Sequence, residues 1–96
     1  MEFKVVFDKA LIVSGKEVRE VVMSTPTIGV EEDAMDNAIA AGRAENPIAA
    51  EVFLYSALTG IPYDVLRTLP SYEYAKLRAA YDTVNRPTAP QAANAQ

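Results

Sequence analysis

Residues 46–60 form the segment that most constrains the fold of this chain. Asn46 followed by Pro47 is typical of a helix N-terminus, because an asparagine side chain caps free amide groups and proline fits the first helical position. Gly60 predicts the end of this helix at residue 59. Its middle, residues 52–55 (VFLY), is apolar around the whole circumference, and such a helix normally packs on several sides. We therefore expect it to be the central helix of the core.

A β-hairpin is predicted at the N-terminal side of the chain. Residues 3–13 and 17–23 are rich in β-branched and aromatic side chains, and Gly15 between them can adopt the positive φ of a tight turn. The first strand partly alternates apolar and polar residues, as expected when one face is buried. Residues 21–23 (VVM) break the alternation in the second strand, and either a bulge there or burial on both faces would account for this.

Three further helical segments are predicted. Residues 30–41 start with an acidic turn, which complements the positive end of a helix dipole, and end before Gly42. A short helical turn starts at Pro62, and Ser71 is expected to cap a last helix that reaches about Asn85. The first of these segments has an apolar series at Ala34, Met35, Ala38 and Ile39.

The predicted fold class is α+β, with an N-terminal β-hairpin (residues 3–24) followed by a small bundle of three to four helices (residues 30–86). A chain of 96 residues has little surplus for a second core, so we expect a single domain over residues 1–86. Residues 87–96 carry no charge and no large apolar side chain, so burial cannot offset the entropy of ordering them. We predict a disordered C-terminal tail there.

The composition excludes several classes of function. Because the chain has no cysteine and no histidine, disulfide scaffolds, ordinary zinc sites and the common Ser-His-Asp and Cys-His catalytic arrangements are impossible. The net charge of −4 argues against nucleic acid as a partner, and no stretch approaches the roughly 18 apolar residues of a membrane span. The dense carboxylates of residues 31–36 match no calcium-binding loop. We expect a protein without catalytic residues, metal or cofactor, suited to a reducing cytosol.

The candidate binding surface lies on the last predicted helix. Four of its side chains recur at spacings of three and four residues and share one face, so the helix is amphipathic. A further tyrosine points elsewhere on the same helix, and tyrosine is enriched in protein interfaces. We predict that this surface binds a partner protein or mediates homo-oligomer formation. The residues concerned are Tyr72, Tyr74, Leu77, Tyr81 and Val84.

Four segments follow one another in the order and spacing of a known family. Residues 57–62 (ALTGIP) form a helix end and turn, and residues 65–77, with Val65, Leu66, Leu69 and the run YEYAKL, form a short helix and a restart. Residues 9–18 (KALIVSGKEV) form a hairpin and residues 24–29 (STPTIG) a strand-to-helix junction. In their order and spacing, which agree across most of residues 3–85, these segments resemble the tail assembly chaperones of Mu-like phages.

The resemblance implies a non-enzymatic protein of the host bacterial cytoplasm. Such a chaperone binds the long, hydrophobic tape measure protein, keeps it soluble and helps tail tube protein to polymerise around it. The resemblance also implies absence from the mature virion. Two alternatives stay open: an acidic phage inhibitor or regulator that binds a host protein, and a minor structural component of the virion.

Overall fold

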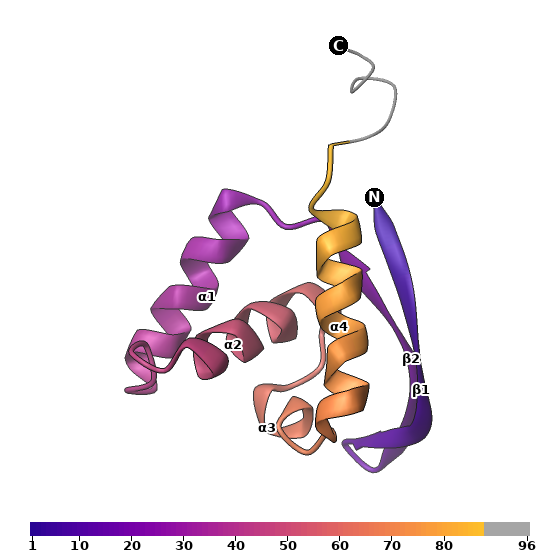
Figure 1. The fold of residues 1–96 in the computed structure, drawn as a ribbon. Helices are drawn as coiled ribbons and strands as arrows, with labels where there is room; N and C mark the ends of the chain where they lie inside the picture. The colour runs from indigo at the N-terminus through magenta and orange to yellow at the C-terminus, as the bar shows by residue number, and fades with distance from the viewer. Residues whose placement is uncertain (88–96) are drawn as a thin grey trace.

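The computed structural model describes residues 1–87 and has an α+β fold (Figure 1). An antiparallel hairpin is followed by helices, which confirms the predicted fold class. The predicted disordered tail lies outside the described residues, apart from Pro87. The elements are β1 (Glu2–Val13), β2 (Lys16–Ser24), α1 (Ile28–Ala40), α2 (Pro47–Thr59), α3 (Tyr63–Leu66) and α4 (Ser71–Val84).

The hairpin turns at Ser14 and Gly15, whose φ angles of 52° and 79° both lie in the left-handed region. Two consecutive left-handed residues match the twist of the flanking strands, so this turn sets the register in which Val13 pairs with Lys16. A bulge interrupts the pairing further along, because residues 7–10 of β1 lie opposite Arg19 alone.

Residues 21–23 of β2 are regular, so both predictions for this segment are wrong. Val21 and Met23 are buried on the inner face of the hairpin, and Val22 between them is exposed on the outer face. The alternation of a one-sided sheet is therefore kept, with an apolar side chain at an outward position.

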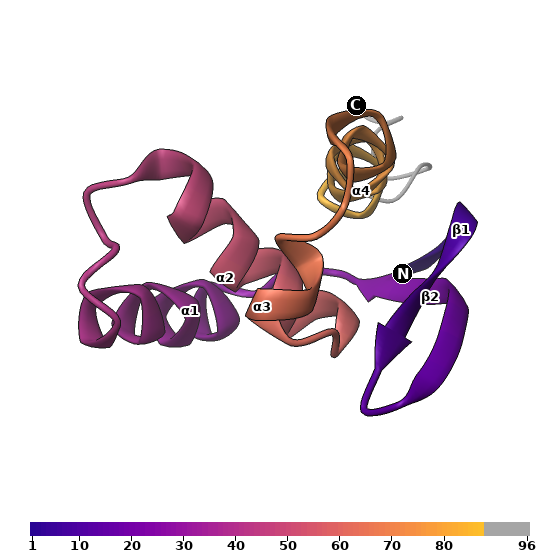
Figure 2. The same ribbon diagram turned by 90° about the horizontal axis from the view of Figure 1, so that it is seen from below.

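Helix α2 is the central helix, as predicted. Its N-terminus is capped by Asn46, whose Oδ1 accepts a hydrogen bond from the amide of Ala49 at 3.0 Å, and its C-terminus ends at Gly60 with φ 80°. It packs against α1, α3 and β2. Figure 2 shows α1 on one side of α2 and the hairpin on the other.

Helix α1 begins two residues before the predicted start. The hydroxyl of Thr27 accepts a hydrogen bond from the amide of Val30 at 3.2 Å, so the cap lies upstream of the acidic turn. The helix ends as predicted before Gly42, whose φ of 73° lets the amide of Arg43 reach the carbonyl of Ala38 at 2.8 Å. Helix α1 packs against α2.

Helix α4 lies along the inner face of the hairpin and packs against both strands (Figure 1). The prediction that Ser71 caps this helix is wrong: Ser71 is its first residue, and Pro70 occupies the cap position without a side-chain hydrogen bond. The helix ends at Val84, next to the predicted Asn85. The hydrophobic core consists of Val5, Phe7, Leu11, Val21, Met23, Val52, Tyr55, Leu58, Ile61, Leu66, Leu77, Ala80 and Val84.

Candidate functional site

The predicted binding residues of α4 differ widely in accessibility. Leu77 and Val84 are fully buried in the chain's own core, so in this conformation they offer no surface to a partner. Tyr74 and Tyr81 are partly buried and pack against the same core. Tyr72 is 63% exposed. The accessible part of the predicted surface is therefore limited to its tyrosines.

The buried stripe of α4 is rotated from the predicted one. Glu73, Leu77, Ala80 and Val84 lie at i, i+4, i+7 and i+11 and face the hairpin, which covers them. The predicted stripe shares Leu77 and Val84 with it, but Tyr74 lies on its flank. The rotation arises because a carboxylate, normally assigned to the polar face, is buried in this helix.

The buried carboxylate of Glu73 holds the bulge of β1. Its Oε2 accepts hydrogen bonds from the amides of Asp8 at 2.7 Å and Lys9 at 3.3 Å. Its Oε1 lies 2.6 Å from Nζ of Lys76 and has no other partner. The hydrogen bond with Lys76 lowers the pKa of Glu73, although burial alone would raise it. Both oxygens are thus engaged within the chain, and Glu73 has a structural role.

Lys76 strengthens the same junction. Its ammonium group donates to the carbonyl of Val6 at 2.9 Å and lies 3.2 Å from Oδ1 of Asp8. On the other side of the bulge, Nη1 of Arg19 donates to the carbonyl of Asp8 at 2.9 Å. Four backbone groups at the bulge therefore find partners in side chains, and Glu73 and Lys76 of α4 bind three of the four.

Three tyrosines connect α4 to the helices beside it. The ring of Tyr55 in α2 lies 5.6 Å from that of Tyr74 and 5.5 Å from that of Tyr81. The hydroxyl of Tyr74 donates to Glu51 of α2 at 3.0 Å, and that of Tyr81 donates to Glu31 of α1 at 3.3 Å. Burial and the nearby Glu51 carboxylate raise the pKa of Tyr55 and Tyr74, so both stay protonated and able to donate.

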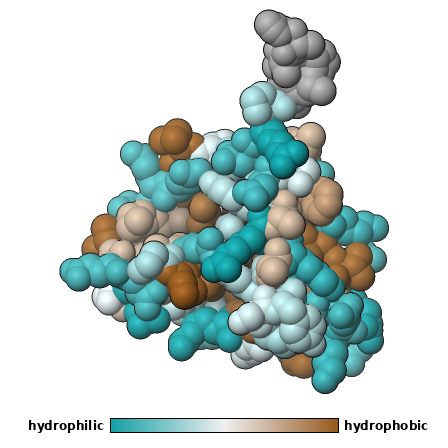
Figure 3. Space-filling model, in the orientation of Figure 1, coloured by the Kyte–Doolittle hydropathy of each residue, from teal (hydrophilic) through white to brown (hydrophobic). Residues whose placement is uncertain are grey.

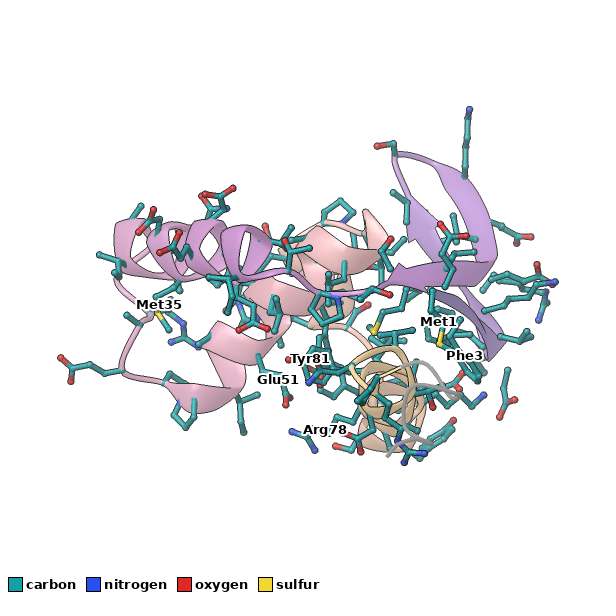
Figure 4. All side chains as sticks on the ribbon, turned by 90° about the horizontal axis from the view of Figure 1, so that it is seen from above. Met1, Phe3, Met35, Glu51, Arg78 and Tyr81 are labelled. Atoms are coloured by element: carbon teal, nitrogen blue, oxygen red, sulfur yellow. The ribbon has the colours of Figure 1, made fainter. Side chains whose placement is uncertain are left out.

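A groove of about 330 Å³ lies between α1, α2 and α4. Figure 4 shows Met35 at the side of α1, and Tyr81 and Glu51 between α2 and α4. The floor is apolar and the two carboxylates stand among the lining residues. These residues are Glu31, Ala34, Met35, Ala50, Glu51, Leu54, Tyr55 and Tyr81.

Helix α1 carries an exposed apolar face next to this groove. Ile28, Met35 and Ile39 are 73%, 44% and 59% exposed, and their spacings of seven and four residues put them on one face, which we call the α1 stripe. The residues that α1 buries are Ala34 and Ala38. Figure 3 shows hydrophobic side chains on the part of the surface that α1 forms.

The α1 stripe was not among the predicted binding residues, although Met35 and Ile39 belonged to the predicted apolar series. The size of the side chains in this helix could have predicted which of its faces is exposed. The same helix has a second line of alanines, which allow close contact with α2 and leave the larger residues outside. Ile28 preceded the predicted start of the helix.

The outer face of the hairpin is a second exposed apolar region. Val6, Ile12 and Val22 point outward, and an ion pair of 3.6 Å between Lys4 and Glu20 crosses this face. At its turn end, Ile12 borders a groove of about 530 Å³ between β1, α3 and α4, which Tyr72 also lines. The α1 stripe differs in placing three exposed apolar side chains on one helix beside a groove.

Other kinds of site are not found in the part of the chain that the structure describes. Within residues 1–87, no group of three or more acidic side chains is arranged to hold a metal ion. No helix in this range combines the length and the hydrophobicity required to cross a membrane. The described residues do carry exposed apolar side chains, which suit the binding of another protein. The candidate functional site is therefore the α1 stripe with the adjoining groove.

Comparison with other proteins gives no further guide to this site. No model of a protein family matches the chain, no curated protein matches it, and no solved structure matches it.

Proposed function

We propose that the chain is a phage tail assembly chaperone that catalyses no reaction. It binds the tape measure protein, keeps it soluble and promotes assembly of the tail tube around it. The order of residues 9–18, 24–29, 57–62 and 65–77, which resembles that of Mu-like tail assembly chaperones, supports this proposal. The α1 stripe, beside the groove, is the structural observation that carries it.

The α1 stripe suits an apolar client. Exposing a large apolar side chain instead of burying it costs about 1.5–3 kcal/mol, so three such residues on one helix represent free energy that a partner recovers on binding. An apolar helix of the client can place its side chains in the groove beside Met35, the mode in which many amphipathic helices are bound.

The charges of α1 complement this role. The helix contains four acidic residues and no basic residue, and the whole chain has a net charge of −4. When α1 covers an apolar segment of the client, the surface exposed to solvent carries the carboxylates of α1 in place of the client's apolar side chains. Charge of one sign on the complex opposes its aggregation.

Co-expression with the tape measure protein of the same phage tests the proposal. The tape measure protein should be found in the soluble fraction in the presence of this chain and in the pellet without it. Ile39→Asp should abolish this effect. Val6→Asp on the outer face of the hairpin is the matched control, because Val6 is 51% exposed, close to the 59% of Ile39, and does not line the groove at Ile12.

Three results would contradict the proposal. If the tape measure protein stays insoluble with the wild-type chain, the chain does not act as its chaperone. Equal effects of the Ile39→Asp and Val6→Asp variants would show that the α1 stripe is not the binding surface. Detection of the chain in purified virions would instead make it a structural component.

The acidic surface of α1 is the observation that favours the alternative, an inhibitor that binds a basic host protein. Salt separates the two functions. Binding through charge weakens steeply as ionic strength rises, whereas binding through apolar contacts is retained. We expect the complex with the tape measure protein to survive in high salt, and its loss there would favour the inhibitor.

A further inference from the structure

Another pocket, of about 430 Å³, lies beside α2, α3 and α4, and its charge is opposite to that of the acidic helix α1. Three arginines line it: Arg43 after α1, Arg67 after α3 and Arg78 within α4. The chain has five arginines in total, so most of them are at this pocket. No aspartate or glutamate among residues 1–87 lines it, although 13 of the 96 residues are acidic.

Aromatic rings hold two of the guanidinium groups in place. Arg67 lies over the ring of Tyr63 at 5.7 Å, and Arg78 lies over the ring of Tyr74 at 5.2 Å. The ring of Tyr63 is itself stacked on Phe53 of α2 at 4.0 Å. These contacts reduce the freedom of the arginine side chains, so less entropy is lost when they bind a ligand.

The charges of the three arginines are not compensated equally. Nε of Arg78 lies 3.0 Å from Oε1 of Glu51, which is outside the pocket lining. Arg43 and Arg67 take part in no ion pair within the described part of the chain. Two guanidinium groups thus remain with free donors at the pocket.

The floor of the pocket is apolar. Ala49 and Val52 come from α2, and Leu66 and Leu69 come from α3 and the segment after it. A small inorganic anion uses none of this surface. An extended polyanion would meet the repulsion of a chain with net charge −4. The combination of separated guanidinium groups and an apolar floor fits a ligand that has carboxylates on both sides of a large apolar side chain.

We propose that this pocket binds an acidic amphipathic helix of a partner protein. One leucine-sized side chain of that helix enters the pocket and contacts its apolar floor. Carboxylates one helical turn away on either side of it bind Arg43 and Arg67. Guanidinium and carboxylate groups form paired, charge-assisted hydrogen bonds, so such contacts specify both the charge and the orientation of the partner.

The pocket and the groove beside the α1 stripe share no lining residue. Glu51 lines the groove and Arg78 lines the pocket, and their ion pair lies at the boundary between them. A client at the α1 stripe and an acidic partner at the pocket would therefore be held on either side of the contact between α2 and α4. This inference does not depend on the proposed function, because it rests on a different surface.

A pair of synthetic helical peptides tests the proposal. Both carry a central leucine, flanked one helical turn away on each side by glutamate in one peptide and by glutamine in the other. Fluorescence anisotropy measures their dissociation constants for the full chain. We expect the glutamate peptide to bind at least about tenfold more tightly than the glutamine peptide. Equal affinities, or no binding of the glutamate peptide, would overturn the proposal.

Variants locate the binding. The double variant R43Q/R67Q should weaken binding of the glutamate peptide by about tenfold or more, whereas K9Q/K16Q, which removes the same charge from the hairpin, should not. Equal losses of affinity in both double variants would show that only the net charge of the chain matters, which would overturn the proposal. Urea unfolding of each variant shows that the fold is kept.

A second copy of the chain is the competing occupant, since its own α1 is acidic. Sedimentation of dilute and concentrated samples separates this case. We expect R43Q/R67Q to leave the oligomeric state unchanged. Loss of self-association in R43Q/R67Q but not in K9Q/K16Q would put a second copy in the pocket and contradict the proposed partner.

Discussion

Helices α1 and α4 are almost equal in length, with 13 and 14 residues, but they face the core in opposite ways. Helix α1 buries two alanines and exposes Ile28, Met35 and Ile39. Helix α4 buries Glu73, Leu77, Ala80 and Val84 and packs against both strands. The difference indicates that α4 stabilises the fold, whereas α1 carries the surface that is free to bind.

The hairpin explains why α4 is used in this way. A two-stranded sheet is at best marginally stable alone, so β1 and β2 depend on a helix to cover their inner face. The buried Glu73 also supplies the acceptor for the amides of Asp8 and Lys9 at the bulge. Helix α1 does not cover the hairpin in this way, since it packs against α2 through small side chains.

The largest difference between the two helices should appear on truncation of an apolar residue. Leu77→Ala leaves a cavity in the core, so we expect the free energy of unfolding to fall by about 2–5 kcal/mol. Met35→Ala on α1 should cost less than about 1 kcal/mol, because the side chain is half exposed. Urea unfolding measures both. Similar losses in the two variants would contradict the division between the helices.

Removal of a carboxylate should give the next largest difference. Glu73→Ala leaves the amides of Asp8 and Lys9 and the ammonium of Lys76 without an acceptor, so it should lower the urea midpoint clearly. Glu32→Ala on α1 removes an exposed carboxylate and should leave the midpoint nearly unchanged. If both midpoints moved equally, Glu73 would not be holding the bulge.

The pH dependence of stability sharpens the same point. The folded-state pKa of Glu73 is lowered, so the unfolded chain binds a proton more readily. The contribution of Glu73 is therefore complete above the unfolded pKa of about 4.3 and is lost as the pH falls through the lower folded value. Urea midpoints between neutral and acidic pH should show a smaller loss in Glu73→Gln than in the wild type. Parallel curves would contradict this.

A small effect is expected where α4 meets α2. Tyr74→Phe removes the hydrogen bond to Glu51, which keeps Arg78 as a partner, so the free energy of unfolding should fall by about 0.5–1.5 kcal/mol. Tyr72→Phe changes an exposed side chain and should have no measurable effect. A larger loss for Tyr72 would place that residue, not Tyr74, in the packing of α4.

The features that could be predicted from the sequence are those set by neighbouring residues. Gly15 marks the hairpin turn, Asn46 and Pro47 start α2, and Gly42 and Gly60 end their helices, because each depends on a local backbone angle or cap. The fold class follows from the order of these signals. The cap of α4 was missed because Pro70 takes the position that a serine usually fills.

The features that could not be predicted depend on contacts between distant residues. Burial of Glu73 requires the bulge of β1, 65 residues away from it along the chain, and nothing near Glu73 indicates this. Which face of an amphipathic helix is covered depends likewise on its neighbours. In α1 the alanines and the large apolar residues both form lines, and packing against α2 selects the alanines. The α1 stripe was therefore identified from the folded structure.

Amide hydrogen exchange of the chain, alone and in complex with the tape measure protein, tests most directly whether α1 is the binding helix. Helix α4 and the hairpin should exchange at the same rates in both samples. Helix α1 and the part of α2 that lines the groove should exchange more slowly in the complex, because the client covers them. Protection gained in α4 or the hairpin, with α1 unchanged, would contradict the assignment of binding to the α1 stripe.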